Sequence, residues 1–262
     1  MQLIYDVGVH DGTDTAYYLR CGYKVIGIEA NPEICSDLNS KFLTEIKDGR
    51  LKILNIGIAA TQGTMDFWIC DSNSEWSSFK RETASRNGSR HHSIPIQCTT
   101  LAEVINTHGV PFYCKIDIEG NDGIALNSLS SVKKLPEYIS VEMSYSRGGN
   151  YIQNLLELGY NRFKIIDQQS RSQPFLPVDY LKAMLPRPAP RIIRRMDTAF
   201  RGVDRDGDWR FSHGSSGPFA EKTPGNWKTA KQVLVDWKRL QNINERFKRR
   251  GLGDWYDIHA AQ

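Results

Sequence analysis

The sequence predicts an α/β protein built on a parallel sheet with flanking helices. Three observations favour this class. Apolar, β-branched runs alternate with amphipathic stretches over the first 180 residues or so, as strands alternate with crossover helices in parallel sheets. The first run, residues 2–7, leads directly into a turn punctuated by Gly8 and Gly12. The remaining residues lack this alternation and are expected to form a C-terminal extension.

The alternation gives an ordered set of expected elements. Strands are expected at residues 2–7, 23–32, 50–60, 63–70, 112–122, 138–144 and 162–167, the fourth being antiparallel if it is a hairpin partner. Helices are expected at residues 13–20, 33–43, 99–109 and 150–160; Asn31 would cap the second, with Pro32 in its first turn. Residues 71–93 are rich in Ser, Asn, Arg and His and are expected to form a long loop.

The C-terminal third has a different composition. A Pro-rich, basic connector is expected at residues 185–195, a Gly/Ser/Pro-rich stretch at 211–227, and one amphipathic helix at 228–250. Four of the six tryptophans lie in this part, whereas disordered tails are poor in aromatic residues. We therefore expect residues 1–180 to form one domain and residues 181–262 to form a basic, Trp-rich extension that packs on it.

Net charge is distributed unevenly along the chain. The formal charge of +4 combines −4 in residues 1–179 with +8 in residues 180–262. A basic extension is either a solvated surface or a site for an anionic partner, such as a glycan, a nucleotide-sugar, RNA or a peripheral membrane surface. DNA is not expected as a partner.

Composition also bounds the class and location of the protein. The chain has 262 residues, of which 40% are hydrophobic and 24% charged, as in ordinary globular proteins. It contains no apolar run long enough for a transmembrane segment and no signal-peptide pattern at its start. The five cysteines are scattered and form no C-x-x-C pair, which is typical of reduced thiols in a cytoplasmic protein.

The turn after the first strand indicates a ligand site. In open α/β sheets, ligands bind outside the carboxyl ends of the strands. The turn is not G-x-G-x-x-G, and Asp6 and Asp11 are acidic where a pyrophosphate would lie. Two acids disfavour a polyanion and favour a cofactor with a cationic end. S-adenosylmethionine fits, because it has an ammonium group, a positive sulfur and no phosphate.

Two further strand ends carry acids. Glu29 ends the second strand about 20 residues after the first turn, where such folds place an acid on the ribose hydroxyls. Asp117 and Glu119 follow a buried strand at positions i and i+2, which share one face if the strand persists. They are candidates to hold a substrate hydroxyl, accept its proton or contact the cofactor's amino group. The alternative is a strand-end turn in which Glu119 caps the next helix.

Five segments together give a specific resemblance. "DVGVHDGTDT", "GIEANP", "TTLAEVI", "KIDIEGND" and "ISVEMS" resemble, in order and spacing, the FkbM-type S-adenosylmethionine-dependent methyltransferases, over roughly residues 3–167. The resemblance implies a Rossmann-like class I methyltransferase with a mostly parallel seven-stranded sheet, and methyl transfer to an oxygen, commonly of a sugar or polyketide.

The resemblance also implies site residues. It places the turn at the cofactor's amino acid end, Glu29 with Ala30 at the ribose, residues 55–58 near the adenine, and Asp117 on the sulfonium side. The cofactor-binding residues are thus expected to be Asp6, Gly8, His10, Asp11, Gly12, Glu29, Ala30, Asn55, Gly57, Ile58 and Asp117. Two departures stand out: Val9-His10 where the family usually has Ala-Asn, and Asn121-Asp122 where it often has Ala-Glu.

Several functions stay open at this point. The leading hypothesis is an O-methyltransferase acting on a glycan, sugar or other small hydroxylated metabolite, with Asp117 and Glu119 as catalytic residues and His213 as a further candidate base. The alternatives are an RNA methyltransferase and a non-catalytic binding or scaffold module on the same fold. No zinc spacing is present, and a magnesium ion held by Asp117 and Glu142 is a less favoured alternative. Tyr160 and Lys164 match the Y-x-x-x-K of short-chain dehydrogenases, but the predicted strand at 162–167 makes the match a chance one.

Overall fold

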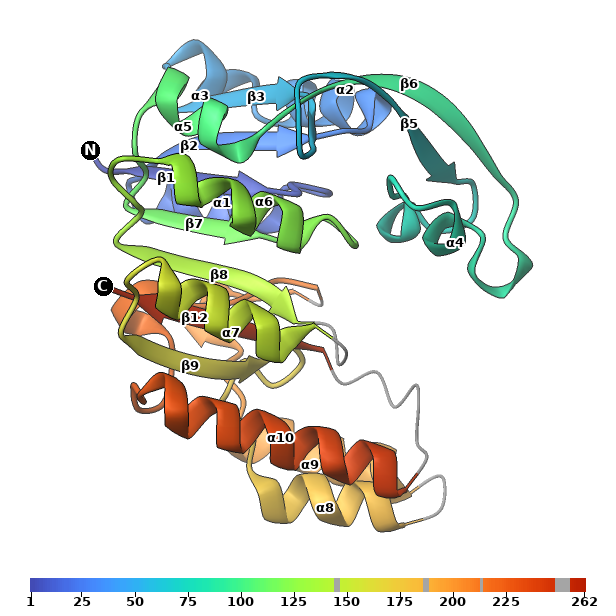
Figure 1. The fold of residues 1–262 in the computed structure, drawn as a ribbon, viewed down its shortest axis with the longest axis vertical. Coiled ribbons are helices and arrows are strands. Elements are labelled where there is room, and N and C mark those ends of the chain that lie inside the picture. Colours follow the sequence, from blue (N-terminus) through green and yellow to red (C-terminus); the bar gives the residue numbers. More distant parts are fainter. Residues whose placement is uncertain (144–146, 186–188, 213, 248–254) are drawn as a thin grey trace. The chain divides into compact units, whose positions relative to one another are not determined.

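The computed structural model describes residues 1–143, 147–185, 189–212, 214–247 and 255–262. The chain forms two compact units, unit 1 (Met1–Ile139) and unit 2 (Ser140–Gln262). Its main sheet has seven strands in the order β3-β2-β1-β7-β8-β12-β9 and is flanked by helices, so the predicted α/β fold class is confirmed (Figure 1). The predicted division near residue 180 stays a prediction about domains, whereas the compact units divide at residue 139.

Unit 1 contains four parallel strands of this sheet. They are β1 (Leu3–Val7), β2 (Lys24–Glu29), β3 (Leu51–Asn55) and β7 (Tyr113–Ile116). Strands β1 and β7 are almost entirely buried, as expected when helices cover both faces of a parallel sheet. The connecting helices are α1 (Thr13–Arg20), α2 (Pro32–Lys41), α3 (Leu43–Lys47), α5 (Leu101–His108) and α6 (Asp122–Ser128), followed by the short η3 (Leu129–Ser131).

Helix starts in unit 1 follow the capping chemistry of the sequence. The Asn31 side chain accepts the Glu33 backbone N–H at 2.9 Å, with Pro32 in the first turn of α2. Thr100 caps α5 by accepting the Glu103 N–H at 3.1 Å. Both predicted helix starts are therefore confirmed.

Unit 1 also contains a second sheet, and one of its strands begins inside the region expected as a long loop. The order is β4-β6-β5, formed by β4 (Gly57–Ile58), β6 (His91–Thr99) and β5 (Gly63–Cys70). Between β5 and β6 lie η1 (Ser74–Trp76), α4 (Arg81–Ala84) and η2 (Arg86–Gly88). The loop prediction for residues 71–93 was wrong, since His91 and His92 begin a nine-residue strand antiparallel to β5. We call residues 63–99 the ribbon (Figure 1).

Unit 2 combines residues from both sides of position 180. The strands β9 (Arg162–Asp167) and β12 (Tyr256–Ala261) are antiparallel neighbours, and β8 (Tyr138–Met143) begins at the boundary with unit 1. Helices α7 (Gly148–Glu157) and α10 (Ala230–Arg246) contact each other. Trp237 of α10 is buried and lies edge-on to Tyr256 of β12, with ring centroids 5.9 Å apart. The described part of the extension thus packs on α7 and β9 within its own unit.

Several elements after β9 were not predicted, among them strand β12 of the main sheet. The others are α8 (Leu176–Met184), α9 (Ala189–Arg201), the hairpin strands β10 (Arg205–Asp206) and β11 (Trp209–Arg210), and η4 (Ala220–Lys222). The connector expected at 185–195 is wrong from residue 189 onward, because Pro190 lies in the first turn of α9, where proline is tolerated. All five cysteines are free thiols. Among the described residues, no helix has the length and apolar character needed to span a bilayer.

Candidate active site

The turns after β1 and β7 meet at the carboxyl edge of the sheet (Figure 1). The Asp117 N–H donates to the Val7 carbonyl at 2.9 Å. Gly8 has φ +93°, and a Cβ built there would lie 1.8 Å from the Asp117 carbonyl oxygen. Gly8 is therefore required by the close approach of the second turn's backbone as well as by its own left-handed conformation.

Gly12 lies against a helix. Its φ is +75°, and a Cβ would lie 2.6 Å from the Phe42 ring and 2.8 Å from the Leu38 side chain. The neighbouring Asp11 carboxylate accepts the Thr13 N–H at 2.9 Å and the Thr13 hydroxyl at 2.8 Å. Asp11 thus organises the first turn of α1 and lies exposed beside it.

Glu29 joins the first turn to the second strand end. Its Oε2 accepts the His10 N–H at 3.1 Å, and its Oε1 accepts the Asn31 N–H at 2.9 Å. Burial raises the pKa of Glu29, opposed by these backbone hydrogen bonds. His10 has a left-handed φ of +50°, and its N–H bond to Glu29 holds the backbone in this conformation. Its side-chain Nε2 lies 2.9 Å from the Ser74 hydroxyl. The turn is thereby linked to the ribbon.

Three carboxylates surround one buried lysine, an arrangement we call the buried charge cluster. Lys115 Nζ lies 3.6 Å from Asp6, 3.3 Å from Asp14 and 3.6 Å from Asp117. Asp6 is completely buried and also accepts the Thr15 hydroxyl at 2.6 Å. Burial raises the pKa of Asp6 to about 6, opposed by Lys115.

The acids of the cluster differ in their exposure. The Asp6 side chain has no exposed surface and faces Lys115, so its assignment to cofactor binding stays a prediction. Asp117 is the partly exposed member, with 27% of its side chain accessible. Of these two acids, Asp117 is therefore the one with surface available to a ligand.

The segment after β7 is organised by an acid that the sequence analysis gave no role. The buried Asp122 carboxylate accepts the N–H groups of Ile118 at 2.9 Å and Gly120 at 3.0 Å. Burial raises its pKa to about 6, opposed by the Ile118 N–H. Asn121 donates to the Ile58 carbonyl at 3.0 Å. Helix α6 begins at Asp122, so the alternative in which Glu119 caps this helix is not what the structure shows.

The ribbon holds the same segment from the other side. Ser78 donates its hydroxyl to the Glu119 carbonyl at 2.7 Å, and Lys80 donates Nζ to the Gly120 carbonyl at 2.6 Å. Arg86 lies 3.4 Å from the Glu119 carboxylate. Glu119 has a left-handed φ of +46°, which is uncommon for a residue with a side chain. Its backbone is thus fixed by partners on the ribbon.

Glu119 has an altered acidity. Burial, and after it the nearby Asp117, raise its pKa to about 7, and Arg86 opposes this shift. Its side chain still has 29% of its surface exposed. A carboxyl group with a pKa near neutral and access to solvent is suited to accept a proton at physiological pH.

The residues expected near an adenine differ in their exposure to solvent. Asn55 donates to the carbonyls of Glu29 and Ala30, both at 3.0 Å, and lines an open hollow along α2. Gly57 and Ile58 are buried: a Cβ at Gly57 would lie 2.3 Å from the Phe79 ring. Asn55 is therefore the exposed member of this set.

The remaining candidates from the sequence are a metal site, Glu142, His213 and the Tyr160–Lys164 pair. The described residues contain no group of three or more His, Cys, Asp and Glu side chains that could hold a metal ion. Glu142 belongs to unit 2, and His213 lies outside the described residues. Lys164 lies in β9, where it donates to the Thr223 carbonyl, so the Y-x-x-x-K match is not helical.

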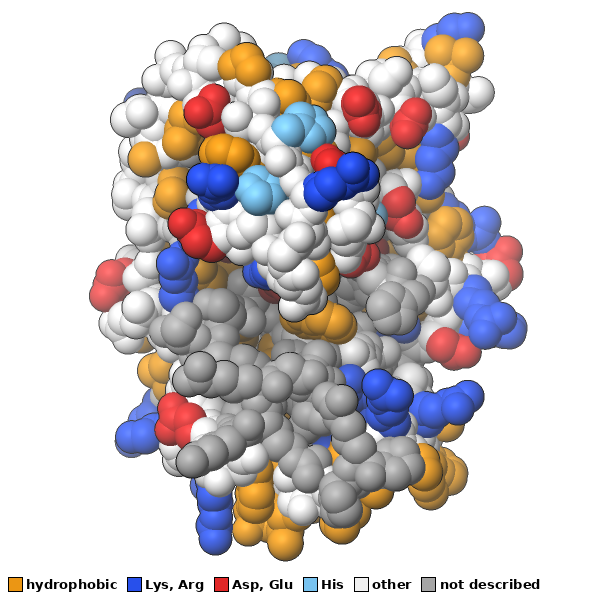
Figure 2. Space-filling model, turned by 90° about the vertical axis from the view of Figure 1, so that its right-hand side faces the viewer, with side chains coloured by type: hydrophobic (Ala, Val, Ile, Leu, Met, Phe, Trp, Pro, Cys, Tyr) orange, Lys and Arg blue, Asp and Glu red, His pale blue; other side chains and the backbone are white. Residues whose placement is uncertain are grey.

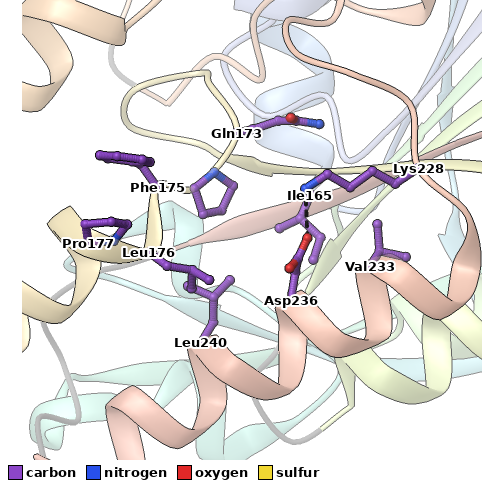
Figure 3. Close-up of a pocket in the computed structure, with 10 residues that line it drawn as sticks. Ile165, Gln173, Phe175, Leu176, Pro177, Lys228, Val233, Asp236 and Leu240 are labelled. Atoms are coloured by element: carbon purple, nitrogen blue, oxygen red, sulfur yellow. Dashed lines mark hydrogen bonds and ion pairs between the residues drawn. The ribbon is translucent and has the colours of Figure 1, made fainter.

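Unit 2 contains a separate apolar pocket of about 230 Å³. It is lined by β9, by the segment leading into α8 and by one face of α10 (Figure 3). Lys228 and Asp236 point toward each other at one side and form an ion pair at 2.7 Å. None of the predicted site residues lines this pocket.

Lys115 and Asp122 are the main residues that the sequence analysis missed. A signal for Lys115 was present, since a lysine inside the apolar strand "YCKI" is almost never buried without an acidic partner. Asp122 offered the weaker signal of an acid two residues after a glycine turn. Ser78, Lys80 and Arg86 gave no signal, because they lie about 40 residues away in a segment expected as a loop.

Comparison with known proteins points to one family. Residues 6–162 match the model of the methyltransferase FkbM domain. No curated protein matches the chain. Two solved structures match part of the chain, both at a TM-score of 0.35. The FkbM methyltransferase from Methylobacillus flagellatus is 14% identical, and the match covers 53% of this chain and 32% of the length of that protein. The precorrin-6y C5,15-methyltransferase from Geobacter metallireducens is 9% identical over 64% of this chain and 68% of its own.

Proposed function

Because the chain belongs to the methyltransferase FkbM domain family, we propose that it is an S-adenosylmethionine-dependent O-methyltransferase. Its acceptor would be a hydroxyl group of a glycan, a sugar or another small hydroxylated metabolite. The observation that supports this most directly is the pair Asp117 and Glu119. Both are partly exposed at the carboxyl end of β7, beside the glycine turn.

The charges at this edge fit the cofactor. Asp11, Glu29, Asp117 and Glu119 belong to the strand-end turns, and Lys115 is occupied by the three acids of the buried charge cluster. An acidic site disfavours a phosphate-rich dinucleotide and favours a ligand with positive ammonium and sulfonium groups. Asp117 would face these cationic groups.

Glu29 retains the capacity to hold a ribose hydroxyl. A carboxylate offers about four lone-pair positions. The N–H groups of His10, Asn31 and Ala30 use three of these positions, which leaves room for a further donor. The same hydrogen bonds fix the orientation of the carboxylate, so a ribose would meet a preorganised acceptor.

The chain's own contribution to the reaction would be orientation and proton acceptance. When bound, the cofactor supplies a methyl group activated by a positive sulfur. Glu119, with its pKa near 7, would accept the proton of the acceptor hydroxyl as the oxygen becomes bonded to carbon. Asp117 would orient the reacting groups, held in place by Lys115 at 3.6 Å.

A calorimetric titration of the full chain tests the cofactor assignment. We expect micromolar binding of both S-adenosylmethionine and S-adenosylhomocysteine, weakened at least about tenfold in Glu29→Ala, because the hydrogen bond of the carboxylate to the ribose is lost. Glu33→Ala is the matched control, since this exposed acid in the first turn of α2 should leave affinity unchanged. No binding of either ligand to the native protein would overturn the proposal, and binding without any turnover would favour the scaffold alternative.

A further inference from the structure

Helix α8 has an inverted distribution of polar and apolar side chains. Its two charged residues, Asp179 and Lys182, are buried and form an ion pair at 2.7 Å. Its large apolar residues Tyr180, Leu181 and Met184 are exposed. In a helix that only packs on a core, the apolar residues face inward and the charges outward. The exposed side of α8 is therefore built for contact with something apolar.

Helix α9 repeats the pattern with regular spacing. Ile192, Met196 and Phe200 are 54%, 55% and 83% exposed. They are four residues apart, so they form one stripe along the helix. The Asp197 side chain is only 9% exposed and pairs with Arg201 at 2.6 Å. In α9, therefore, the large apolar residues of the stripe are more exposed than the acid.

The charge beside the stripe has one sign. Arg191 and Arg195 are exposed, and each directly precedes a residue of the stripe, Ile192 or Met196. The two acids within α8 and α9, Asp179 and Asp197, both pair with cations. The two helices pack against each other. Figure 2 shows hydrophobic side chains with Lys and Arg beside them at its lower end, where Figure 1 labels α8 and α9.

We propose that the exposed faces of α8 and α9 dock unit 2 onto an anionic lipid bilayer. An apolar stripe flanked by arginines is the pattern of helices that lie in the membrane interface, with the apolar side chains among the acyl chains and the cations at the headgroups. The charge of +8 carried by residues 180–262 complements an anionic surface. Both helices are shorter than a spanning segment, so the face lies on the bilayer.

A flotation assay with the full chain tests this proposal. The probes are phosphatidylcholine vesicles with and without phosphatidylglycerol, at low and high salt. We expect flotation with the anionic vesicles, suppressed by salt, and little with the neutral ones. Phe200→Glu should weaken binding at least about tenfold, because an anion replaces a large apolar side chain that would enter the acyl region of the bilayer. Arg191→Gln with Arg195→Gln should weaken it roughly fivefold for each arginine lost.

Matched controls distinguish docking from misfolding. Leu43→Glu introduces the same charge at an exposed leucine of unit 1 and should leave flotation unchanged. Circular dichroism and thermal melting of each variant should match the native protein, since the replaced side chains are exposed. The absence of flotation by the native chain, or full flotation by Phe200→Glu, would overturn the proposal. Self-association that Phe200→Glu abolishes, without vesicle binding, would assign the face to a second copy of the chain instead.

Discussion

Unit 1 and unit 2 handle charged side chains differently. In unit 1, acids gather at strand ends around Lys115, and Asp117 and Glu119 keep part of their surface exposed. In unit 2, α8 buries the ion pair of Asp179 and Lys182, α9 pairs Asp197 with Arg201, and both helices expose large apolar residues. Charges with access to solvent can take part in chemistry, whereas an exposed apolar face can only bind. The comparison sets the proposed reacting region of unit 1 against the proposed docking face of unit 2.

The largest expected effect is the loss of the buried lysine of unit 1. Lys115→Met would leave three carboxylates close together without a cation, and we expect the free energy of unfolding to fall by roughly 3–5 kcal/mol. Denaturant unfolding measures this. The exposed pair of Lys222 and Asp206 gives the control, since Lys222→Met should cost less than about 1 kcal/mol. Equal losses in both variants would contradict the role of the cluster.

Lys182→Met sharpens the comparison, because it breaks a buried pair in unit 2. We expect it to destabilise the protein yet leave the affinity for S-adenosylmethionine unchanged, as measured by calorimetry at a temperature where the variant is folded. If it lowered cofactor affinity as much as Lys115→Met, the assignment of the two units to separate tasks would be wrong.

The next effect concerns the two candidate catalytic acids. Asp117→Asn and Glu119→Gln should each reduce turnover at least about a hundredfold with the fold intact, because each removes a carboxylate that positions the reacting groups or accepts a proton. Turnover is followed as S-adenosylhomocysteine release with an active acceptor, with Glu33→Gln as the control. Near-native rates would remove the substituted residue from catalysis.

A smaller effect is expected at Asp122. Asp122→Asn places an amide where two backbone N–H groups, those of Ile118 and Gly120, now donate to a carboxylate. The loss of an acceptor should lower the free energy of unfolding by about 1–3 kcal/mol, measured by thermal and denaturant melting. Turnover should fall as well, since the position of Glu119 depends on this segment. A variant with native stability would contradict the organising role of Asp122.

The smallest effect is on pH dependence. Glu119 must be ionised to accept a proton, so turnover should rise with pH through about 7 and level off above it. Arg86 lowers the pKa of Glu119; Arg86→Gln should therefore move the rise to higher pH. The measurement is a pH–rate profile, and an identical profile for both proteins would exclude Glu119 as the titrating group.

Much of unit 1 follows from local sequence, because its elements are set by local chemistry. The strand "LIYDV", the Asn31 and Thr100 caps and the alternating pattern each depend on near neighbours. Strand β6 was missed because it contains two histidines and Pro95. Pro95 is tolerated at a position where β6 pairs with β5 alone, away from the β4 contact at Cys98 and Thr99.

Unit 2 was harder to predict for a different physical reason. Periodicity identifies a helix by its buried apolar face, and α8 and α9 expose theirs. The proline-rich sequence around Pro190 then favoured a connector. The candidate site was also only partly predictable. The acids at the strand ends were predicted from their spacing in the sequence. The partners supplied by the ribbon depend on tertiary contacts, which no local pattern contains.

The hydrogen bonds from Ser78 and Lys80 to the segment after β7 have a consequence for the order of folding. They join residues about 40 positions apart, whereas the helix caps of unit 1 join residues two or three apart. Local contacts form early, and distant ones wait for loop closure. Strand β7 pairs with β1 across a still longer stretch of chain, with Ile4 beside Tyr113, so the segment after β7 depends on two sets of distant contacts. Glu119 would therefore reach its left-handed conformation, and the site its competence for chemistry, only when both the sheet and the ribbon have closed.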